Sequence, residues 1–128
     1  MVALSCPCQS GKSFDDCCAP VIMGELPAKT AEALMRSRYT AFTLRDEAYL
    51  LASWHPSTRP TALNLAIEPV PKWIGLQVRQ QVQTGDNTAI VEFVARYRIG
   101  GKAHRLHETS RFVREEHRWF YVDGELHD

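Results

Sequence analysis

Four cysteines lie close to the N-terminus, and the rest of the chain contains none: Cys6, Cys8, Cys17 and Cys18. Two disulfides suit this spacing poorly, because neighbouring cysteines rarely bridge and two loops in so short a stretch would strain the S–S geometry. Four thiolates, in contrast, converge readily on one Zn²⁺ in a tetrahedron, which leaves no open position for water or substrate. The spacing therefore predicts a structural zinc knuckle, with reduced thiols or a redox pair as the alternatives.

The residues between the cysteines fit a metal-binding loop, since Ser10-Gly11-Lys12 favours a tight turn and carries a compensating positive charge. The run from Cys6 to Cys18 resembles the SEC-C motif, known from the C-terminal tail of the preprotein translocase ATPase SecA. This resemblance implies zinc and docking on a protein partner. Gln9 stands where the motif usually has glycine, and Asp15 and Asp16 stand where lysines are common. The two aspartates indicate a partner different from that of lysine-rich relatives.

A second group of chemically active residues lies further along the chain. Arg38 falls inside an apolar helical stripe, four residues after Leu34, where a guanidinium needs a carboxylate partner or a path to solvent. Glu108 and Ser110 lie between two apolar residues on one face of a predicted strand. Glu108 is the natural partner of Arg38 if helix and sheet pack face to face. Such a pair is either a structural ion pair or the polar floor of a pocket.

The sequence thus offers a candidate ligand pocket made of Arg38, Tyr39, Trp54, His55, Glu108, Ser110, Tyr121 and Asp123. Histidine is a side chain suited to acid or base chemistry near neutral pH, and His55 stands before Pro56 at a predicted helix end. A histidine in that place also serves as a simple partner of the helix dipole, and the three aromatic residues also suit an ordinary core. No Ser-His-Asp order, phosphate loop or dinucleotide fingerprint appears that would identify a catalytic residue.

Composition sets the frame for these sites. The 128 residues are 45% hydrophobic and 23% charged, which is typical of one globular domain with room for a small appendage. Fifteen basic and fifteen acidic residues cancel, so no global field favours nucleic acid or a membrane surface. No apolar run reaches the ~20 residues of a membrane span. Residues 1–5 carry no positive charge, so we expect no signal peptide and a cytoplasmic protein.

The elements that position these residues begin with helices. Residues 20–29 contain two prolines and a glycine and are predicted to be a linker. Thr30 is a suitable N-cap for a helix over residues 31–44, whose apolar residues recur at helical spacing. Asp46 is a suitable cap for a shorter helix that ends near His55-Pro56.

From Leu63 onward the apolar residues alternate, which predicts strands. The first alternating segment, residues 63–67, is brief, and longer strands follow with turn sequences at residues 84–87, 100–102 and 115–117. Short links between strands predict an antiparallel meander, and helices followed by a curled sheet make an α+β fold. The predicted organisation is a zinc-binding motif over residues 1–19, the linker over residues 20–29 and an α+β domain over residues 30–128.

The same segments resemble the YchJ-like family of uncharacterised bacterial proteins. The resemblance rests on Arg36-Ser37-Arg38-Tyr39, Ala41-Phe42, Trp54-His55-Pro56, Phe93-Val94-Ala95-Arg96-Tyr97, Glu108, Ser110-Arg111-Phe112 and Tyr121-Val122-Asp123-Gly124. It implies a cone similar to nuclear transport factor 2, in which helices cap a strongly bent sheet around a cavity. The family carries no biochemical activity over to this chain.

Three functions compete on this reading. The first is an adaptor that docks on a protein partner through the zinc knuckle. The second is a small-molecule-binding protein or enzyme that uses the cone cavity around Arg38, His55 and Glu108. The third is nucleic-acid binding along stripes of strand arginines, and the acidic residues interspersed among those arginines disfavour it: Arg96, Arg98, Arg105 and Arg111. We expect binding rather than catalysis.

Overall fold

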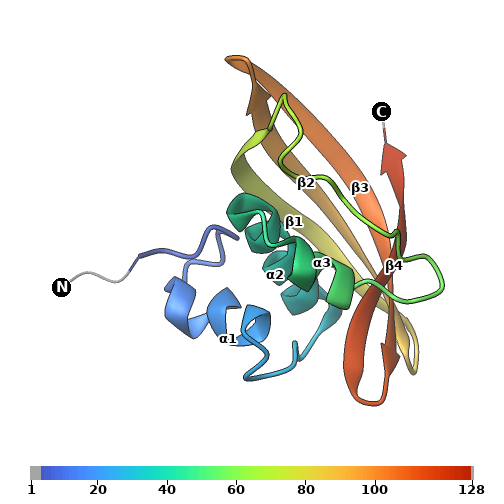
Figure 1. The fold of residues 1–128 in the computed structure, drawn as a ribbon. Coiled ribbons are helices and arrows are strands. Elements are labelled where there is room, and N and C mark those ends of the chain that lie inside the picture. The colour runs from blue at the N-terminus through green and yellow to red at the C-terminus, as the bar shows by residue number, and fades with distance from the viewer. Residues whose placement is uncertain (1–3, 128) are drawn as a thin grey trace.

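The computed structural model describes residues 4–127 and begins with helices (Figure 1). A short 3-10 helix, η1 (Phe14–Asp16), precedes α1 (Cys18–Ile22), α2 (Ala31–Leu44) and α3 (Glu47–Ala52). The predicted caps of α2 and α3 are confirmed, because Thr30 Oγ1 accepts from the amide of Ala33 and Asp46 Oδ1 accepts from the amide of Tyr49, both at 3.0 Å. Helix α2 has the bounds that the sequence predicted.

Four antiparallel strands follow in the order of the chain: β1 (Lys72–Gly85), β2 (Thr88–Ile99), β3 (Lys102–Glu115) and β4 (Arg118–His127). Tight turns at Asp86-Asn87, Gly100-Gly101 and Glu116-His117 join them, which confirms the predicted meander. Both residues of the last two turns have positive φ, the backbone that matches the right-handed twist of the flanking strands.

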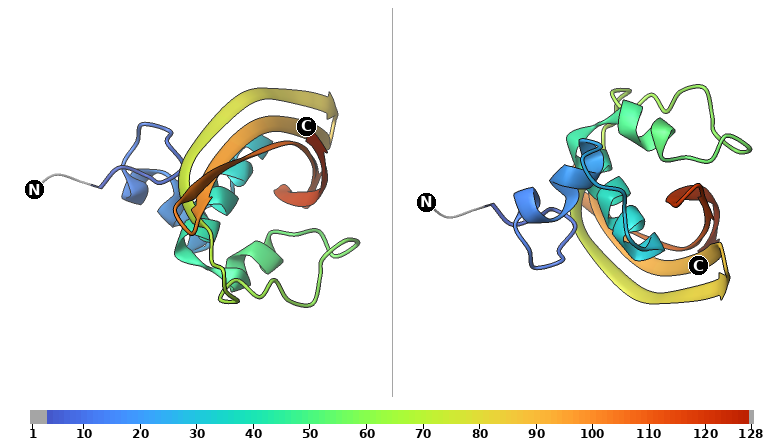
Figure 2. Two further views of the ribbon diagram at one scale, coloured as in Figure 1. Left: turned by 90° about the horizontal axis from the view of Figure 1, so that it is seen from above. Right: turned by 90° about the horizontal axis from the view of Figure 1, so that it is seen from below.

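The sheet curls around α2, so the helix lies in its concavity (Figure 2). The end of α3 joins the last strand: the amide of His55 donates to the carbonyl of Tyr121 at 2.7 Å, and the amide of Tyr121 donates to the carbonyl of Ser53 at 2.9 Å. This bridge closes the cone at the side opposite β1. The confirmed architecture is a cone of helices packed on a curved antiparallel sheet.

Two details of the sequence prediction are corrected. Residues 63–67 form turns rather than a strand, because Asn64 has a φ of 56° and the amide of Ile67 turns back to the Asn64 carbonyl at 3.2 Å. Residues 20–22, predicted as linker, belong to helix α1. The division of the chain into motif, linker and domain otherwise stays a prediction. The predicted motif and domain include residues 1–3 and 128, which lie outside the described residues.

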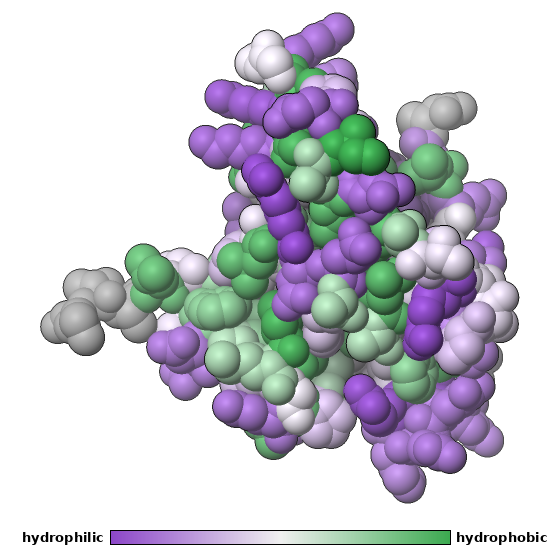
Figure 3. All heavy atoms as spheres, viewed as in Figure 1, coloured by the Kyte–Doolittle hydropathy of each residue, from purple (hydrophilic) through white to green (hydrophobic). Residues whose placement is uncertain are grey.

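One apolar core joins the N-terminal motif to the cone. Its buried members come from the motif, α2 and all four strands, and they include Cys6, Cys8, Cys18, Leu34, Met35, Tyr39, Leu76, Val91, Phe93, Phe112 and Trp119. Figure 3 shows further apolar side chains on the surface of the face that carries the motif and α1, where Leu4, Met23 and Leu26 are exposed. The cysteines therefore lie within the fold rather than beside it.

Candidate functional site: a cysteine cluster and a cone cavity

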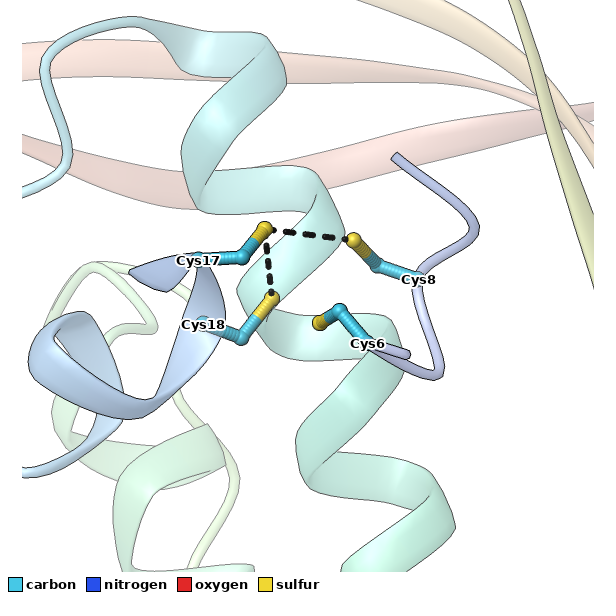
Figure 4. Close-up of side chains that lie close together, drawn as sticks. All are labelled: Cys6, Cys8, Cys17 and Cys18. Atoms are coloured by element: carbon cyan, nitrogen blue, oxygen red, sulfur yellow. Dashed lines mark hydrogen bonds between the residues drawn. The ribbon is translucent and has the colours of Figure 1, made fainter. Parts of the chain in front are cut away.

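The four cysteine sulfurs meet at one point against α2 (Figure 4). All four lie within 4.8 Å of one another, with Sγ–Sγ distances of 3.6 Å from Cys8 to Cys17 and 3.9 Å from Cys17 to Cys18. Zinc bonds of about 2.3 Å in a tetrahedron place sulfurs about 3.8 Å apart. The spacing of the sulfurs and the all-thiolate donor set therefore fit a single tetrahedral zinc ion.

A tight loop brings the first two cysteines to this point. The amide of Gln9 donates to the carbonyl of Cys6 at 3.1 Å, and the amide of Cys6 donates to the carbonyl of Lys12 at 2.9 Å. Gln9 has a φ of 62°, a left-handed backbone that favours glycine, and this is the position at which the resembled motif usually has glycine. The side-chain oxygen of Gln9 accepts from the amide of Leu76 in β1 at 3.2 Å. This side chain ties the loop to the sheet.

Helix α2 supplies polar partners to the cluster. The hydroxyl of Thr40, fully buried, donates to Cys18 Sγ at 3.3 Å and lies 3.7 Å from Cys6 Sγ. Arg36 donates through Nη1 to the carbonyl of Cys8 at 2.7 Å, which brings a positive charge to the cluster. Such outer partners orient the ligands of a metal and favour their charged form. The motif is therefore supported by side chains of the cone domain.

The cysteines also differ in acidity. A hydrogen bond from Cys18 holds the pKa of Cys8 far below its ordinary value, at about 4, against the opposing effect of burial. The hydrogen bond to Cys8 and burial both raise the pKa of Cys18. The cluster therefore holds one thiolate that accepts hydrogen bonds from neighbouring thiols. A metal that binds such a cluster displaces the remaining thiol protons.

A second feature is a cavity of about 250 Å³ between α2 and the concave face of the sheet. Its walls are largely apolar and aromatic, and they are formed by Met35, Arg38, Tyr39, Phe42, Trp54, Trp73, Phe93, Ala95, Leu106, Glu108, Ser110, Phe112 and Tyr121. The sequence analysis predicted Arg38, Tyr39, Trp54, Glu108, Ser110 and Tyr121 for a pocket, and the structure places them around this cavity. The aliphatic walls and Trp73 were missed, because apolar residues of a pocket and of a core look alike in sequence.

Arg38 is the most buried charge of the cavity, with 5% of its surface exposed. Its Nη1 donates to the carbonyl of Leu50 at 2.7 Å and to Ser53 Oγ at 2.6 Å. The guanidinium carbon lies 4.5 Å from the ring centroid of Tyr121 and 5.2 Å from that of Trp54. Burial lowers the pKa of Arg38 to about 10, so that the group still carries its charge at neutral pH.

The predicted ion pair of Arg38 with Glu108 is wrong. Among residues 4–127, none of the ion pairs involves Arg38. The end of α3 satisfies Arg38 instead, and Ser110 Oγ donates to Glu108. Arg38 and Glu108 still line the same cavity. Their placement matches the alternative interpretation from the sequence, in which they form the polar floor of a pocket.

Glu108 and Tyr121 complete the polar part of the cavity. A side chain at position 124 would collide with the carboxylate of Glu108, so Gly124 in the neighbouring strand leaves the space that this carboxylate occupies. Burial, followed by the nearby charge of Glu108, raises the pKa of Tyr121 to about 12. The Tyr121 hydroxyl therefore keeps its proton at neutral pH and is available as a hydrogen-bond donor.

His55 and Asp123 do not belong to the cavity. His55 Nε2 lies 2.9 Å from Glu115 Oε2 and its Nδ1 lies 2.7 Å from Ser57 Oγ, both near the surface. Asp123 Oδ1 accepts from Arg111 Nε at 2.5 Å on the outside of the sheet. The prediction that these two residues line the pocket is wrong, because His55 lies beyond the α3–β4 bridge and Asp123 points to the other face of β4.

The outer face of the sheet carries mixed charge. Arg96 lies directly opposite Arg105 in the register of β2 and β3, but Glu92 pairs with His107 at 2.7 Å and Asp123 pairs with Arg111. This interspersed charge is the pattern that the sequence predicted for the strand arginines. None of the described helices has the length and apolar character needed to cross a membrane.

Comparison with known proteins agrees with both parts of the structure. The SEC-C motif model matches residues 5–20, and the model of the YchJ middle NTF2-like domain matches residues 30–124. The cysteine cluster and the cone thus define a protein with an N-terminal SEC-C motif and an NTF2-like domain. The chain belongs to the UPF0225 family with a YchJ-like domain.

Relatives match along almost the whole chain. A UPF0225 protein of Methylibium petroleiphilum is 55% identical over 96% of this chain and 89% of its own, and one of Ralstonia nicotianae is 51% identical over 95% and 91%. The solution structure of a SEC-C motif protein from Rhodopseudomonas palustris is 36% identical, with a TM-score of 0.88 over 98% of this chain and 100% of its own. A crystal structure from Psychrobacter arcticus has a TM-score of 0.80 at 29% identity, over 96% of this chain and 82% of its own.

Proposed function

We propose that this protein binds a small, largely apolar molecule in the cone cavity. The observation that carries the proposal is the cavity itself, about 250 Å³ of space beside a buried arginine. Water fills such a volume poorly, because each water occupies about 30 Å³ and needs two to four polar partners. Aromatic and aliphatic walls with a few convergent polar groups are typical of small-molecule sites.

We further propose that the cysteine cluster holds Zn²⁺ in a structural role. Four thiolates leave no position for substrate, and the contacts of Thr40 and Arg36 join the site to the cone domain. Metal analysis of protein purified without added metal tests this assignment. One zinc per chain, lost in Cys8→Ser, is the expected result, and a chain with four titratable thiols and no metal contradicts it.

The binding proposal is tested by filling the cavity. Leu106→Trp places a larger side chain in the wall, whereas Leu126→Trp makes the same change at a surface position of β4 that is 66% exposed. A fragment library screened by NMR should shift signals of Met35 and Phe93 in the native protein and in the Leu126→Trp control. Leu106→Trp should remove these shifts. Fragments that bind all three proteins equally would place their site outside the cavity and contradict the proposal.

The contacts described above bear differently on the three other predicted functions. Docking of the knuckle on a protein partner stays a prediction, and the exposed Leu4, Met23 and Leu26 supply apolar surface beside the motif for it. An enzyme using His55 loses its support, since His55 is bound to Glu115 outside the cavity. Nucleic-acid binding gains nothing from the mixed-charge sheet face.

A further inference from the structure

The unused donors of Arg38 point to the chemistry of the ligand. Both hydrogen bonds found for the guanidinium among residues 4–127 are made by Nη1, which leaves the donors of Nε and Nη2 without a protein partner. In the same described part, every fully buried side-chain nitrogen or oxygen has a hydrogen-bond partner. Nε and Nη2 must therefore reach space that solvent can enter. Because Arg38 lines the cavity and is otherwise enclosed, that space is the cavity.

The side chain is also fixed in place before any ligand arrives. Nη1 is held by the end of α3, and the guanidinium lies over the ring of Tyr121. The edge formed by Nε and Nη2 is one of the two edges with which a guanidinium binds a carboxylate through two parallel hydrogen bonds. An arginine held this way loses little side-chain entropy on binding.

Glu108 limits the charge that such a ligand can carry. Its carboxylate lines the same cavity and accepts only the hydroxyl of Ser110 among the described side chains. Glu108 repels any anion in this poorly solvated space, and the repulsion is about twice as large for a phosphate dianion, so a monoanion paired directly with Arg38 is the anion that the cavity tolerates best. The remaining wall is largely apolar and aromatic, so we expect the rest of the molecule to be largely apolar as well.

We infer that the cavity is specific for an apolar monocarboxylic acid, whose carboxylate accepts two hydrogen bonds from Nε and Nη2 of Arg38. Glu108 is the specificity residue that rejects dianions. This inference rests on the proposed binding function and adds the class of ligand to it.

Three probes of similar size test the inference on the whole chain: 3-phenylpropanoate, its primary amide, and benzyl phosphate. Binding is followed by NMR shifts of the Met35 methyl group. Since a charge-assisted pair is worth 1.4 kcal/mol or more, we expect the carboxylate to bind at least about tenfold more tightly than the amide and than the phosphate. Arg38→Met should remove the preference for the carboxylate over the amide, and Glu108→Gln should raise the affinity for benzyl phosphate about tenfold.

The outcomes separate this inference from the function on which it rests. Equal binding of carboxylate and amide in the native protein overturns the inference and leaves the cavity as a binding site. A carboxylate preference that survives in folded Arg38→Met also overturns it, and Arg38→Gln, which likewise removes the charge, repeats the test if the methionine variant does not fold. If neither the three probes nor the fragment library shifts the NMR signals of the cavity residues, both the inferred ligand class and the proposed binding function are contradicted.

Discussion

The hydroxyl of Thr40, in the middle of α2, donates a hydrogen bond to the sulfur of Cys18 at 3.3 Å. This contact joins the cysteine cluster to the same helix that carries Arg38 and Tyr39 into the cavity two residues and one residue earlier. The N-terminal motif and the cavity thus share one helix, with the sulfurs on one side and the cavity on the other. If the cluster holds zinc as proposed, loss of that metal should affect more than the motif.

Metal removal is therefore expected to destabilise the whole protein. Cys6, Cys8 and Cys18 belong to the same core as Leu34 and Met35, so the cluster cannot open without exposing that core. Chelation, or Cys8→Ser, should lower the melting temperature by roughly 10 °C or more. Amide hydrogen exchange should show weaker protection across β2 and β3. A chelator should have no further effect on Cys8→Ser. If only the amides of residues 6–18 exchange faster, the knuckle folds independently of the cone, as a flexible linker would allow, and the prediction is wrong.

Replacing Thr40 by valine tests the contact itself. Valine keeps the shape of the buried side chain and removes the hydroxyl that faces Cys18 and Cys6. Outer-shell changes of this kind lower metal affinity by 10–100-fold, and we expect about tenfold here, measured by competition with a chromophoric chelator. Thr43→Val is the matched control, because the Thr43 hydroxyl donates to the carbonyl of Thr40 rather than to sulfur. Equal metal affinities of Thr40→Val and Thr43→Val would show that the Thr40 hydroxyl does not support the cysteine cluster.

Arg38→Met should leave stability nearly unchanged, although the residue is 5% exposed. Burial lowers the pKa of Arg38 to about 10, so the charge is carried at an energetic cost at pH 7, and that cost fades only as the pH rises through about 10. Methionine removes the cost, and Leu50 still has Ser53 Oγ as a donor at 3.2 Å. We expect a change in unfolding free energy within about 1 kcal/mol by urea denaturation.

The same substitution two residues earlier in α2 supplies the control. Arg36→Met deletes the hydrogen bond to the Cys8 carbonyl at 2.7 Å and should cost about 1–2 kcal/mol. If Arg38→Met costs more than about 3 kcal/mol, as loss of a buried charged partner does, Arg38 is a structural residue rather than one kept for a ligand.

Gly124→Ala is expected to destabilise the protein by about 1–3 kcal/mol in thermal unfolding. The new methyl group would overlap the Glu108 carboxylate, which must then leave the hydroxyl of Ser110. Glu108→Ala opens the occupied space, so adding Gly124→Ala to that variant should cost no more than about 0.5 kcal/mol. A cost that is the same in both backgrounds would place the strain in the backbone of β4 instead.

Part of this site was readable from sequence because its signals are local. All four cysteines of the cluster fall within one short segment. The start of α2 is fixed by Thr30, whose side chain accepts from the amide of Ala33 three residues later. Tight turns likewise fix which strands pair. These features depend on neighbours in the chain, and the structure confirms the cluster, the helix and the meander.

The partners of Arg38 were not readable, because they depend on how α3 docks. A backbone carbonyl of Leu50 and the ring of Tyr121 leave no charge pattern in sequence, whereas Glu108 does, and the ion pair was inferred from charge alone. His55 was misplaced for a similar reason: only the bridge between α3 and β4 decides on which side of the wall its ring lies. The sequence thus predicted which kinds of side chain line the cavity, but not which groups each of them contacts.

The bridge between Ser53 and Tyr121 has a consequence for the order in which the protein is made. The cysteine motif, α2 and α3 leave the ribosome first, while the residue that closes the cone follows only after three strands have been translated. Until then Arg38 lacks its contact with the ring of Tyr121, so the cavity is completed only once β4 has been translated. The four cysteines precede all of the strands in the chain, so the proposed metal site is fully translated well before the proposed ligand site.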